Sequence, residues 1–343
     1  MGKTESLGGN QQVIMANFLI IGGAGYIGSH VTLSLVSAGH RVTVLDNLSR
    51  GHRQAVMSDD FISGNLGDAT LLNTIFSSRR IDCVMHFAGF IQVGESVTKP
   101  LDYYRNNVAA TITLLEVMRD HRGPGLVFSS SAAVYGDPDH IPIPEDALVR
   151  PINPYGESKS MVEAILAHCE RAYGLRSVSL RYFNAAGADE SGRIGEDHHP
   201  ETHLIPLVLR AALGKQDHIR IFGDDYDTPD GTCIRDYIHV SDLAEAHILA
   251  ARHLLDGGPN RVYNLGSQHG YSVREIIEMA RRVTGRSIMA VTSEKRTGDP
   301  ARLVASSKKI QAELGWRPRF DDPEKIIASA WTWYQRHPDG YQD

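Results

Sequence analysis

The sequence has no long apolar run, few cysteines and no excess of positive charge. No stretch of its 343 residues is apolar for long enough to cross a bilayer, so no membrane span is expected. The formal net charge of −6 argues against a surface that binds nucleic acid. The three cysteines, Cys83, Cys169 and Cys233, are odd in number and widely spaced, which indicates reduced thiols in a cytoplasmic protein.

The remaining composition is that of a globular protein with 42% hydrophobic residues, in a chain long enough for two domains. Residues 1–16 are polar, glycine-rich and without period, so they predict a disordered tail with no signal peptide.

From residue 17 the chain alternates short apolar runs with helix-length segments. The runs lie at 18–21, 41–46, 61–66, 81–89, 126–131 and 177–183. Continuous apolarity between helices predicts a Rossmann-type, doubly wound parallel α/β sheet over 17–187. After about residue 187 this rhythm breaks and long polar loops begin, so 188–343 is predicted to form a smaller α+β domain. Segments near 236–267 again read as helix and strand, and they are expected to return to the first domain.

A glycine-rich turn follows the first strand. The stretch FLIIGGAGYIGSH places Gly22, Gly25 and Gly28 between a strand and a helix, where glycine lets the backbone approach a pyrophosphate. The second strand ends at Asp46, which is placed to accept a hydrogen bond from a ribose 2′-hydroxyl and to repel a 2′-phosphate. The pattern predicts a dinucleotide site for NAD rather than NADP.

Other candidate cofactor contacts lie at the carboxyl ends of strands, where a doubly wound sheet binds its ligand. Asn65 ends the third strand and is placed to meet the adenine, while Phe87, Ala88 and Gly89 end the fourth. Each of these residues alone would equally suit plain packing.

A tyrosine and a lysine stand one helical turn apart in NPYGESK. Lys159 and a positively charged nicotinamide would both favour the phenolate of Tyr155, which could then take the proton of an alcohol while its carbon loses hydride. Ser131, in the hydroxyl row SSSAAVYG that closes the fifth strand, could bind the same oxygen or relay the proton. The pair is weak evidence alone, but together with the glycine turn and Asp46 it predicts a catalytic site.

The order of these motifs resembles that of extended short-chain dehydrogenases/reductases, and among them the UDP-glucose 4-epimerases. The resemblance extends from the first strand to the end of the chain. It rests on GGAGYIGSH, LDNLSRG, HFAGFIQVGESV, YYRNNV, SSSAAVYG, NPYGESK, RYFNAAGA, IFGDDYDTPDGTCIRDYIHVSDLA, YNLGS, RTGDPA and LGWRP. It implies that a fixed NAD oxidises C4 of a UDP-hexose and that the 4-keto sugar turns over before hydride returns to its other face.

The resemblance also assigns roles to individual residues. Tyr155 is implied as the base, Lys159 as the group that binds the ribose and lowers the tyrosine pKa, and Ser131 as the bridging hydroxyl. The implied cofactor contacts are Gly22, Gly25, Tyr26, Ile27, Gly28, Asp46, Asn47, Asn65, Leu66, Phe87, Ala88, Gly89, Asn107, Ser129, Tyr155, Lys159 and Tyr182. The implied UDP-sugar contacts are Ser131, Asn184, His203, Leu204, Phe222, Arg235, Arg296, Asp299 and Leu303, the two arginines being suited to a diphosphate.

The exact substrate stays open. Ala132 and Ala133 stand where 4,6-dehydratases carry an acidic pair, which argues against elimination. Leu303 aligns with a position that controls access for N-acetyl sugars, but leucine fits neither the narrow nor the permissive type. Epimerisation of UDP-N-acetylglucosamine or of a UDP-pentose or UDP-uronate is therefore an alternative. A non-catalytic NAD-binding regulator is a further alternative, although the tyrosine, lysine and serine are all intact.

Two further expectations concern metal and assembly. The stretch EDHHPETH holds His199 and His203 four residues apart, but Pro200 interrupts any helix that would align them, so no metal site is expected. Segments 100–120 and 156–174 are apolar on more than one face, which one sheet cannot cover. In the similar family such helices pair as a four-helix bundle, so a homodimer is expected.

Overall fold

A parallel sheet of seven strands forms the centre of the protein in the computed structural model, which describes residues 15–296 and 299–342. The strand order is β11-β6-β5-β4-β1-β2-β3, and every neighbouring pair is parallel. The strands are β1 (Asn17–Ile21), β2 (Arg41–Asp46), β3 (Asp60–Ser63), β4 (Cys83–His86), β5 (Gly125–Ser129), β6 (Ser177–Tyr182) and β11 (Arg261–Leu265). The predicted Rossmann-type α/β fold is confirmed. Except for Met15 and Ala16, the predicted tail lies outside the described residues.

Both faces of the sheet are covered, which explains why its strands are apolar at successive positions. In β1, Phe18 and Ile20 belong to one apolar core while Leu19 and Ile21 belong to another, because successive side chains point to opposite faces. All four side chains are buried. The sheet is therefore the middle of three layers.

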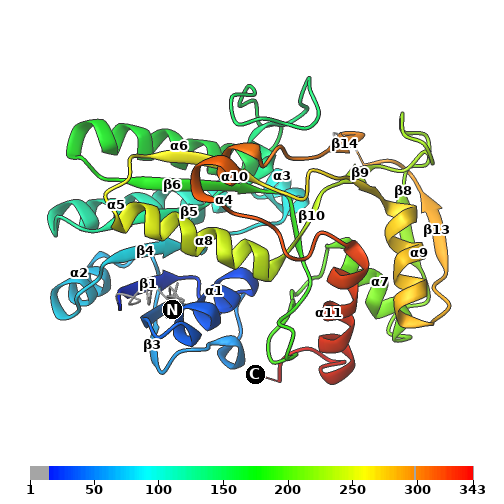
Figure 1. Cartoon of the computed structure of the whole chain (residues 1–343), viewed down its shortest axis with the longest axis horizontal. Coiled ribbons are helices and arrows are strands. Elements are labelled where there is room, and N and C mark those ends of the chain that lie inside the picture. The colour runs from blue at the N-terminus through cyan, green and yellow to red at the C-terminus, as the bar shows by residue number, and fades with distance from the viewer. Residues whose placement is uncertain (1–14, 297–298, 343) are drawn as a thin grey trace, which may run out of the picture.

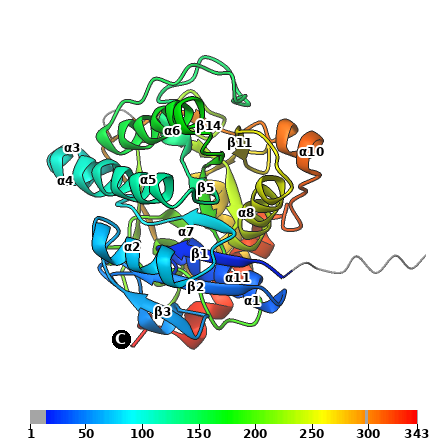
Figure 2. The ribbon, with the colours of Figure 1, turned by 90° about the vertical axis from the view of Figure 1, so that its left-hand side faces the viewer.

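Helices form the two outer layers (Figure 2). One side carries α1 (Tyr26–Ser37) and α8 (Val240–Leu255), and the other carries α2 (Ala69–Ser78), α5 (Ala110–Asp120) and α6 (Pro154–Tyr173). The shorter elements are η1 (Arg53–Ala55), α3 (Val93–Thr98), η3 (Ala132–Val134) and α10 (Lys308–Leu314). Among the described residues, no helix is long and apolar enough to span a bilayer.

The helix predicted at 100–120 forms in three parts. It begins as α4 (Pro100–Tyr103), widens into the π-helix η2 (Tyr104–Ala109) and continues as α5. A π-helical turn inside a helix often marks a functional site. Here it holds Asn107, which faces the loop after β4.

A second lobe lies beyond the carboxyl ends of the sheet (Figure 1). Its helices are α7 (Leu204–Ala212), α9 (Val273–Thr284) and α11 (Pro323–Arg336), and its strands β8 (Ile219–Phe222) and β13 (Ala290–Ser293) pair in parallel. These elements share an apolar core that includes the fully buried Trp333. Short strands join the lobes: β7 (Asn184–Ala186) pairs with β10 (Tyr237–His239), and β9 (Ile234–Arg235) lies between β12 (Tyr271–Ser272) and β14 (Arg302–Leu303).

The chain returns to the main sheet after it has entered the second lobe. From β10 it runs through α8, which packs on the sheet, into β11, which pairs with β6 as an edge strand. The division into domains at residue 187 stays a prediction.

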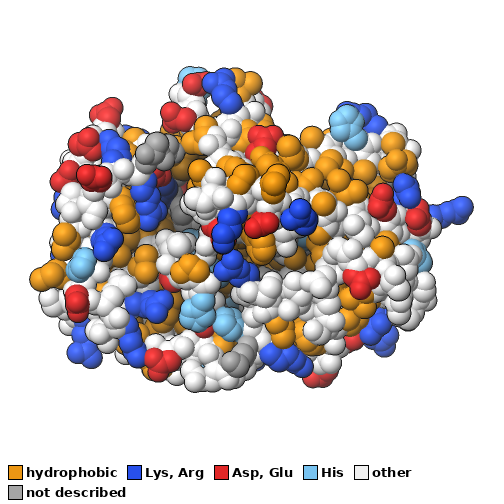
Figure 3. All heavy atoms as spheres, turned by 180° about the vertical axis from the view of Figure 1, so that it is seen from behind, with side chains coloured by type: hydrophobic (Ala, Val, Ile, Leu, Met, Phe, Trp, Pro, Cys, Tyr) orange, Lys and Arg blue, Asp and Glu red, His pale blue; other side chains and the backbone are white. Residues whose placement is uncertain are grey.

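The strand order places a crevice between β1 and β4. From β1 the chain winds outward to β2 and β3, and from β4 it winds the other way, so the loops after β1 and β4 diverge. Ligands of doubly wound sheets bind at this point, beyond the carboxyl ends of the strands. A cavity of about 1310 Å³ opens here, and the space-filling view shows the molecule hollowed between its lobes (Figure 3).

Candidate active site

The glycine turn after β1 forms one end of the cavity. Gly22 has φ +82°, and a Cβ atom there would lie 2.5 Å from the backbone nitrogen of Ala88. A Cβ atom on Gly28 would lie 2.2 Å from the carbonyl oxygen of Gly22. The chain therefore needs glycine at both positions, and the bare backbone at the start of α1 fits an approaching pyrophosphate.

The carboxylate of Asp46 lies beside this turn at the end of β2. Its Oδ2 accepts a hydrogen bond from the backbone nitrogen of Ala24 at 3.0 Å, and its Oδ1 accepts one from Leu48 at 2.8 Å. Burial raises the pKa of Asp46, and these backbone donors oppose that shift. The group is held in a fixed position at the cavity wall, as a ribose acceptor would need to be.

Asn65 lies across from Asp46 on the loop after β3. Its Oδ1 accepts a hydrogen bond from Nδ2 of Asn47 at 2.7 Å, and both residues line the cavity. The side-chain oxygen of Asn65 is thus already hydrogen-bonded to Asn47. Contact between Asn65 and an adenine stays a prediction.

The loop after β4 is fixed by Asn107 from the π-helix. Its Oδ1 accepts from the backbone nitrogen of Phe90 at 2.8 Å, and its Nδ2 donates to Phe90 O and to Ser158 Oγ, both at 3.0 Å. Asn107 is the one predicted site residue that does not line the cavity. Its side chain supports the loop that carries Phe87, Ala88 and Gly89, while direct contact with a cofactor stays a prediction.

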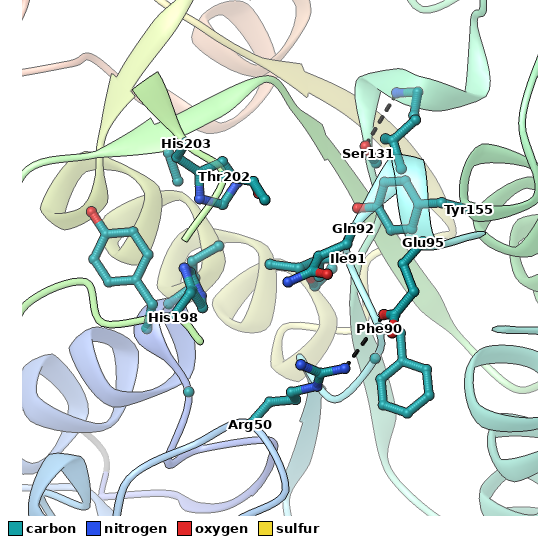
Figure 4. Close-up of a pocket in the computed structure, with 18 of the residues that line it drawn as sticks. Arg50, Phe90, Ile91, Gln92, Glu95, Ser131, Tyr155, His198, Thr202 and His203 are labelled. Carbon is teal, nitrogen blue, oxygen red and sulfur yellow. Dashed lines mark hydrogen bonds and ion pairs between the residues drawn. The ribbon is translucent and has the colours of Figure 1, made fainter. Parts of the chain in front are cut away.

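The first turn of α6 positions Tyr155. The side chain of Asn153 caps this helix by accepting from the nitrogen of Gly156 at 2.9 Å, and Pro154 occupies the first helical position. This geometry places Tyr155 and Lys159 on one helix face, and both line the cavity. Figure 4 shows the ring of Tyr155 beside Ser131.

The electrostatics around Tyr155 differ from the sequence-based expectation. Burial raises the pKa of Tyr155, and the Ser131 hydroxyl, not Lys159, is the neighbour that lowers it. Nζ of Lys159 donates a hydrogen bond to the carbonyl oxygen of Ser129 at 2.8 Å and lies 6.0 Å from the centre of the Tyr155 ring. Burial also lowers the lysine pKa to about 8, so the ammonium loses its proton at a lower pH than an exposed lysine would. The combined effect of Lys159 and a bound nicotinamide on the phenol stays a prediction.

The hydroxyls near the tyrosine are ordered by the protein. Ser131 Oγ accepts a hydrogen bond from the nitrogen of Ala133 at 3.1 Å, and Ser129 Oγ bonds the hydroxyl of Tyr182 at the end of β6. Ser131 is 8% exposed and faces the cavity, so it is free to contact a ligand oxygen as well.

The second lobe contributes two arginines to the far end of the cavity. Arg235 in β9 forms an ion pair with Asp299, and the guanidinium of Arg296 lies 3.9 Å from the centre of the Phe222 ring. Leu303 in β14 pairs directly with Arg235. Two cations beside an aromatic ring and a carboxylate form a surface suited to a nucleoside diphosphate.

The other predicted substrate contacts occupy the wall between these ends. Asn184 donates from Nδ2 to the carbonyl oxygen of Asp236 at 2.9 Å, and Leu204 begins α7. His203 turns its Nδ1 to within 2.6 Å of Glu196 Oε1. All three line the cavity, which thus contains every predicted site residue except Asn107.

Comparison with known proteins identifies the family. A model of the NAD dependent epimerase/dehydratase family matches residues 18–266. The chain belongs to this family.

Relatives of this family member match over nearly their whole length. A curated UDP-glucose 4-epimerase of Halalkalibacterium halodurans is 54% identical over 323 residues, which are 94% of this chain and 97% of the relative. A solved UDP-glucose 4-epimerase from Brucella ovis in complex with NAD has a TM-score of 0.90 and 48% identity, covering 92% and 97% of the two chains. That from Bifidobacterium longum, in complex with NAD+ and UDP, has a TM-score of 0.91 and 39% identity, covering 95% and 100%.

The cavity of this epimerase/dehydratase-family protein also contains residues that sequence reasoning did not single out. Arg50 pairs with Glu95 at 3.4 Å, and its guanidinium lies 5.5 Å from the centre of the Phe90 ring (Figure 4). Gln92 lies beside them and donates to the carbonyl oxygen of Pro200 at 3.1 Å. These residues lie in motifs quoted above, LDNLSRG and HFAGFIQVGESV, but only the fold brings the two loops together.

Proposed function

We propose that the protein is an NAD-dependent UDP-glucose 4-epimerase that interconverts UDP-glucose and UDP-galactose through a 4-keto-hexose intermediate, as in galactose metabolism. The observation that carries this proposal is one cavity lined by the glycine turn at one end, the arginines of the second lobe at the other, and Tyr155 with Ser131 between. The family and the full-length relatives named UDP-glucose 4-epimerase support it.

The residues present fit NAD. Gly22 and Gly28 leave room that a Cβ atom would fill, and Asp46 supplies the ribose acceptor at the end of β2. When bound, NAD supplies a hydride acceptor and, once reduced, a hydride donor. Lys159 and the loop at 87–89 are proposed to hold its nicotinamide half.

The protein's own part in the reaction is proton transfer and binding. Tyr155 takes the proton from the 4-hydroxyl and gives it back after the sugar has turned, so protons balance over the cycle. Ser131 hydrogen-bonds the same oxygen and is the neighbour that lowers the tyrosine pKa. Arg235 and Arg296 hold the diphosphate throughout, which lets the hexose turn while the nucleotide stays bound.

Elimination of water is disfavoured by the residues after Ser131. Ala132 and Ala133 line the cavity where an acid would be needed to eliminate a hydroxyl from the sugar. Epimerisation therefore fits these side chains better than the dehydratase chemistry that the family name also covers.

We expect the purified protein to convert UDP-galactose to UDP-glucose, monitored by proton NMR, with UDP-N-acetylgalactosamine as a parallel substrate. Leu303 pairs with Arg235 at the cavity wall and is of intermediate size, so the second substrate reports how much room it leaves. Conversion of the first alone indicates a narrow site, and conversion of both indicates a permissive one. Conversion of neither by NAD-loaded protein would refute the hexose assignment and point to UDP-pentoses or UDP-uronates.

We propose that two copies of the chain pair through α5 and α6. Each helix buries one face on the sheet, through Leu114 and Val162, and leaves an outer apolar face that includes Ile112 and Met161, which are 39% and 38% exposed. Leu101 on α4 extends this face and is 71% exposed. Figure 3 shows hydrophobic side chains gathered over this part of the molecule, which suits a four-helix bundle.

Replacing Ile112 by lysine should therefore shift the protein from dimer to monomer, because a buried unpaired charge opposes the bundle. Light scattering after size exclusion measures the mass. Val291→Lys is the matched control, since Val291 is similarly exposed at 42% but lies on β13 in the second lobe. A wild-type mass of one chain at micromolar concentration would contradict the dimer.

We also propose a cytoplasmic location. The three cysteines are free, and burial raises the pKa of Cys83 to about 12, so that thiol stays protonated. A chain that needs no disulfide suits a reducing compartment.

A further inference from the structure

Four side chains converge in the loop between β7 and α7. Glu196, His198, Glu201 and His203 each offer one ligand atom, and these atoms all lie within 4.8 Å of one another. The loop is not helical, so Pro200 does not keep the histidines apart as the sequence suggested. The ring of His203 lies beside the ring of His198, with the centroids 5.3 Å apart. The side chain of His199 is instead 66% exposed. His198 and His203 lie across the cavity from Ser131 and Tyr155 (Figure 4).

The spacing of these atoms is that of ligands around one ion. Nδ1 of His198 lies 3.3 Å from Glu196 Oε1 and 3.6 Å from Glu201 Oε2, and Nδ1 of His203 lies 2.6 Å and 3.3 Å from Glu196 Oε1 and Glu201 Oε1. Nitrogen and oxygen ligands bind Zn²⁺ at about 2.0–2.2 Å, which separates the corners of a tetrahedron by about 3.3–3.6 Å. The distances from His198 Nδ1 to the two carboxylates, 3.3 Å and 3.6 Å, meet this value without any movement.

Hydrogen bonding does not account for the cluster. Glu196 Oε1, His198 Nδ1, Glu201 Oε2 and His203 Nδ1 are buried, and none has a hydrogen bond of acceptable geometry with any described residue. The side chains of Glu196 and Glu201 are only 4% and 2% exposed. Short distances without aligned donors are expected when atoms point at a common centre instead of at one another.

The surrounding residues hold the ligands in place. Glu201 Oε1 accepts hydrogen bonds from the backbone nitrogens of Thr202 at 2.7 Å and His203 at 2.8 Å, which orients that carboxylate. The rings of His198 and Tyr26 pack nearly at right angles with their centroids 6.2 Å apart, and the Tyr26 hydroxyl donates to the carbonyl oxygen of Gly187 at 2.6 Å. Two carboxylates and two neutral imidazoles around a divalent ion leave no net charge in this partly buried site.

We propose that Glu196, His198, Glu201 and His203 bind one divalent transition-metal ion, with Zn²⁺ the best match to two imidazoles and two carboxylates. Four protein ligands fill a tetrahedral site, so the ion holds structure and is not part of the reaction. It fixes the loop at 196–203, which forms a wall of the cavity and receives Arg50 Nη1 on the carbonyl oxygen of His199 at 3.0 Å. The proposal goes beyond the epimerase reaction and is tested without measuring it.

The competing account is a cluster of two protonated histidines and two carboxylates. The neighbouring carboxylates raise the pKa of His198 to about 9 and of His203 to about 10 against the effect of burial, so the cluster would also be neutral with protons in place of the ion. A count of bound metal in solution distinguishes protons from an ion at this cluster.

The first experiment is elemental analysis of the purified full-length protein. One zinc per chain is expected, removed by dialysis against a strong chelator with a lower Tm, and Zn²⁺ but not Mg²⁺ should restore both. Anomalous diffraction at the zinc edge should place the ion between the four side chains. Metal-free protein that binds no Zn²⁺ in a titration against a chromogenic chelator would overturn the proposal.

Variants separate this site from metal bound elsewhere. His198→Ala and Glu201→Gln should each weaken Zn²⁺ binding by more than about 100-fold, since loss of even an outer partner weakens such sites by about 10- to 100-fold. His199→Ala is the matched control and should keep one zinc per chain, because its exposed ring lies outside the cluster. Retention of zinc by both cluster variants, or an ion located elsewhere in the crystal, would refute the assignment. The diffraction experiment uses the wild-type chain and so stands even if a variant fails to fold.

Discussion

Tyr155→Phe is expected to lower kcat for UDP-galactose by about 10²- to 10⁴-fold, the usual contribution of a general base. The change removes one oxygen atom and leaves the ring, so NAD content and UDP affinity should stay at the wild-type level. Lys159 is poorly suited to replace the phenol as acceptor, because its ammonium already donates a hydrogen bond to the carbonyl oxygen of Ser129. Steady-state kinetics with an NAD assay on the same samples checks this prediction.

Tyr173→Phe is the matched control for this change. Tyr173 lies at the end of the same helix, α6, but is 57% exposed and outside the cavity, so its loss of a hydroxyl should leave kcat unchanged. A Tyr155→Phe enzyme within about 10-fold of wild type would contradict the assignment of Tyr155 as the base, since that is below the range for such groups.

Gly22→Ala is expected to abolish stable cofactor binding and to lower the free energy of unfolding by roughly 4 kcal/mol or more, the range of the most damaging substitutions. The added Cβ atom would meet three backbone atoms, among them the nitrogen of Ala88 at 2.5 Å and its Cα at 2.8 Å. Backbone cannot rotate away as a flexible side chain can, so β1 and the loop after β4 would have to separate. Denaturant unfolding and the NAD content after purification measure the two effects.

Gly39→Ala separates this clash from backbone strain. Gly39 has φ +83°, nearly the same as Gly22, but a Cβ atom there meets nothing within 4 Å. Strain alone should lower the free energy of unfolding by about 1–2 kcal/mol, with NAD retained. If the two variants were equally stable, the close approach to Ala88 would not be what requires glycine at position 22.

The central sheet and the cofactor end of the site were predictable because their signals are local. Strands such as β1 and β5 are recognisable as continuous apolar runs. The order strand, glycine turn, helix and Asp46 fits within thirty residues of chain. The capped start of α6, which positions Tyr155, is equally local, since Asn153 and Pro154 adjoin it. Spacing along one element is enough to place such groups.

The parts that sequence reasoning missed depend on contacts between distant segments. Spacing along α6 places Lys159 near Tyr155, but it does not show that the Lys159 ammonium donates a hydrogen bond to the carbonyl oxygen of Ser129 in β5. Arg50 meets Glu95 only because the loops after β2 and β4 lie side by side at the crevice. The Glu196–His203 cluster was judged by helical spacing, yet it forms in a loop, where no period relates sequence distance to spatial distance.

The edge strand β11 has a consequence for how the protein is made. Strand β6 has no partner on its outer side until residues 261–265 have been synthesised, long after the rest of the sheet has left the ribosome. During that interval it presents an unpaired row of backbone donors and acceptors, the kind of surface through which nascent chains associate. The face of the sheet that α8 covers, which includes β4, β5 and β6, also stays exposed until α8 has been synthesised. A message truncated near the predicted boundary at 187 would therefore yield an aggregation-prone fragment rather than a small dinucleotide-binding protein. Rapid translation of the second lobe should favour recovery of the folded enzyme.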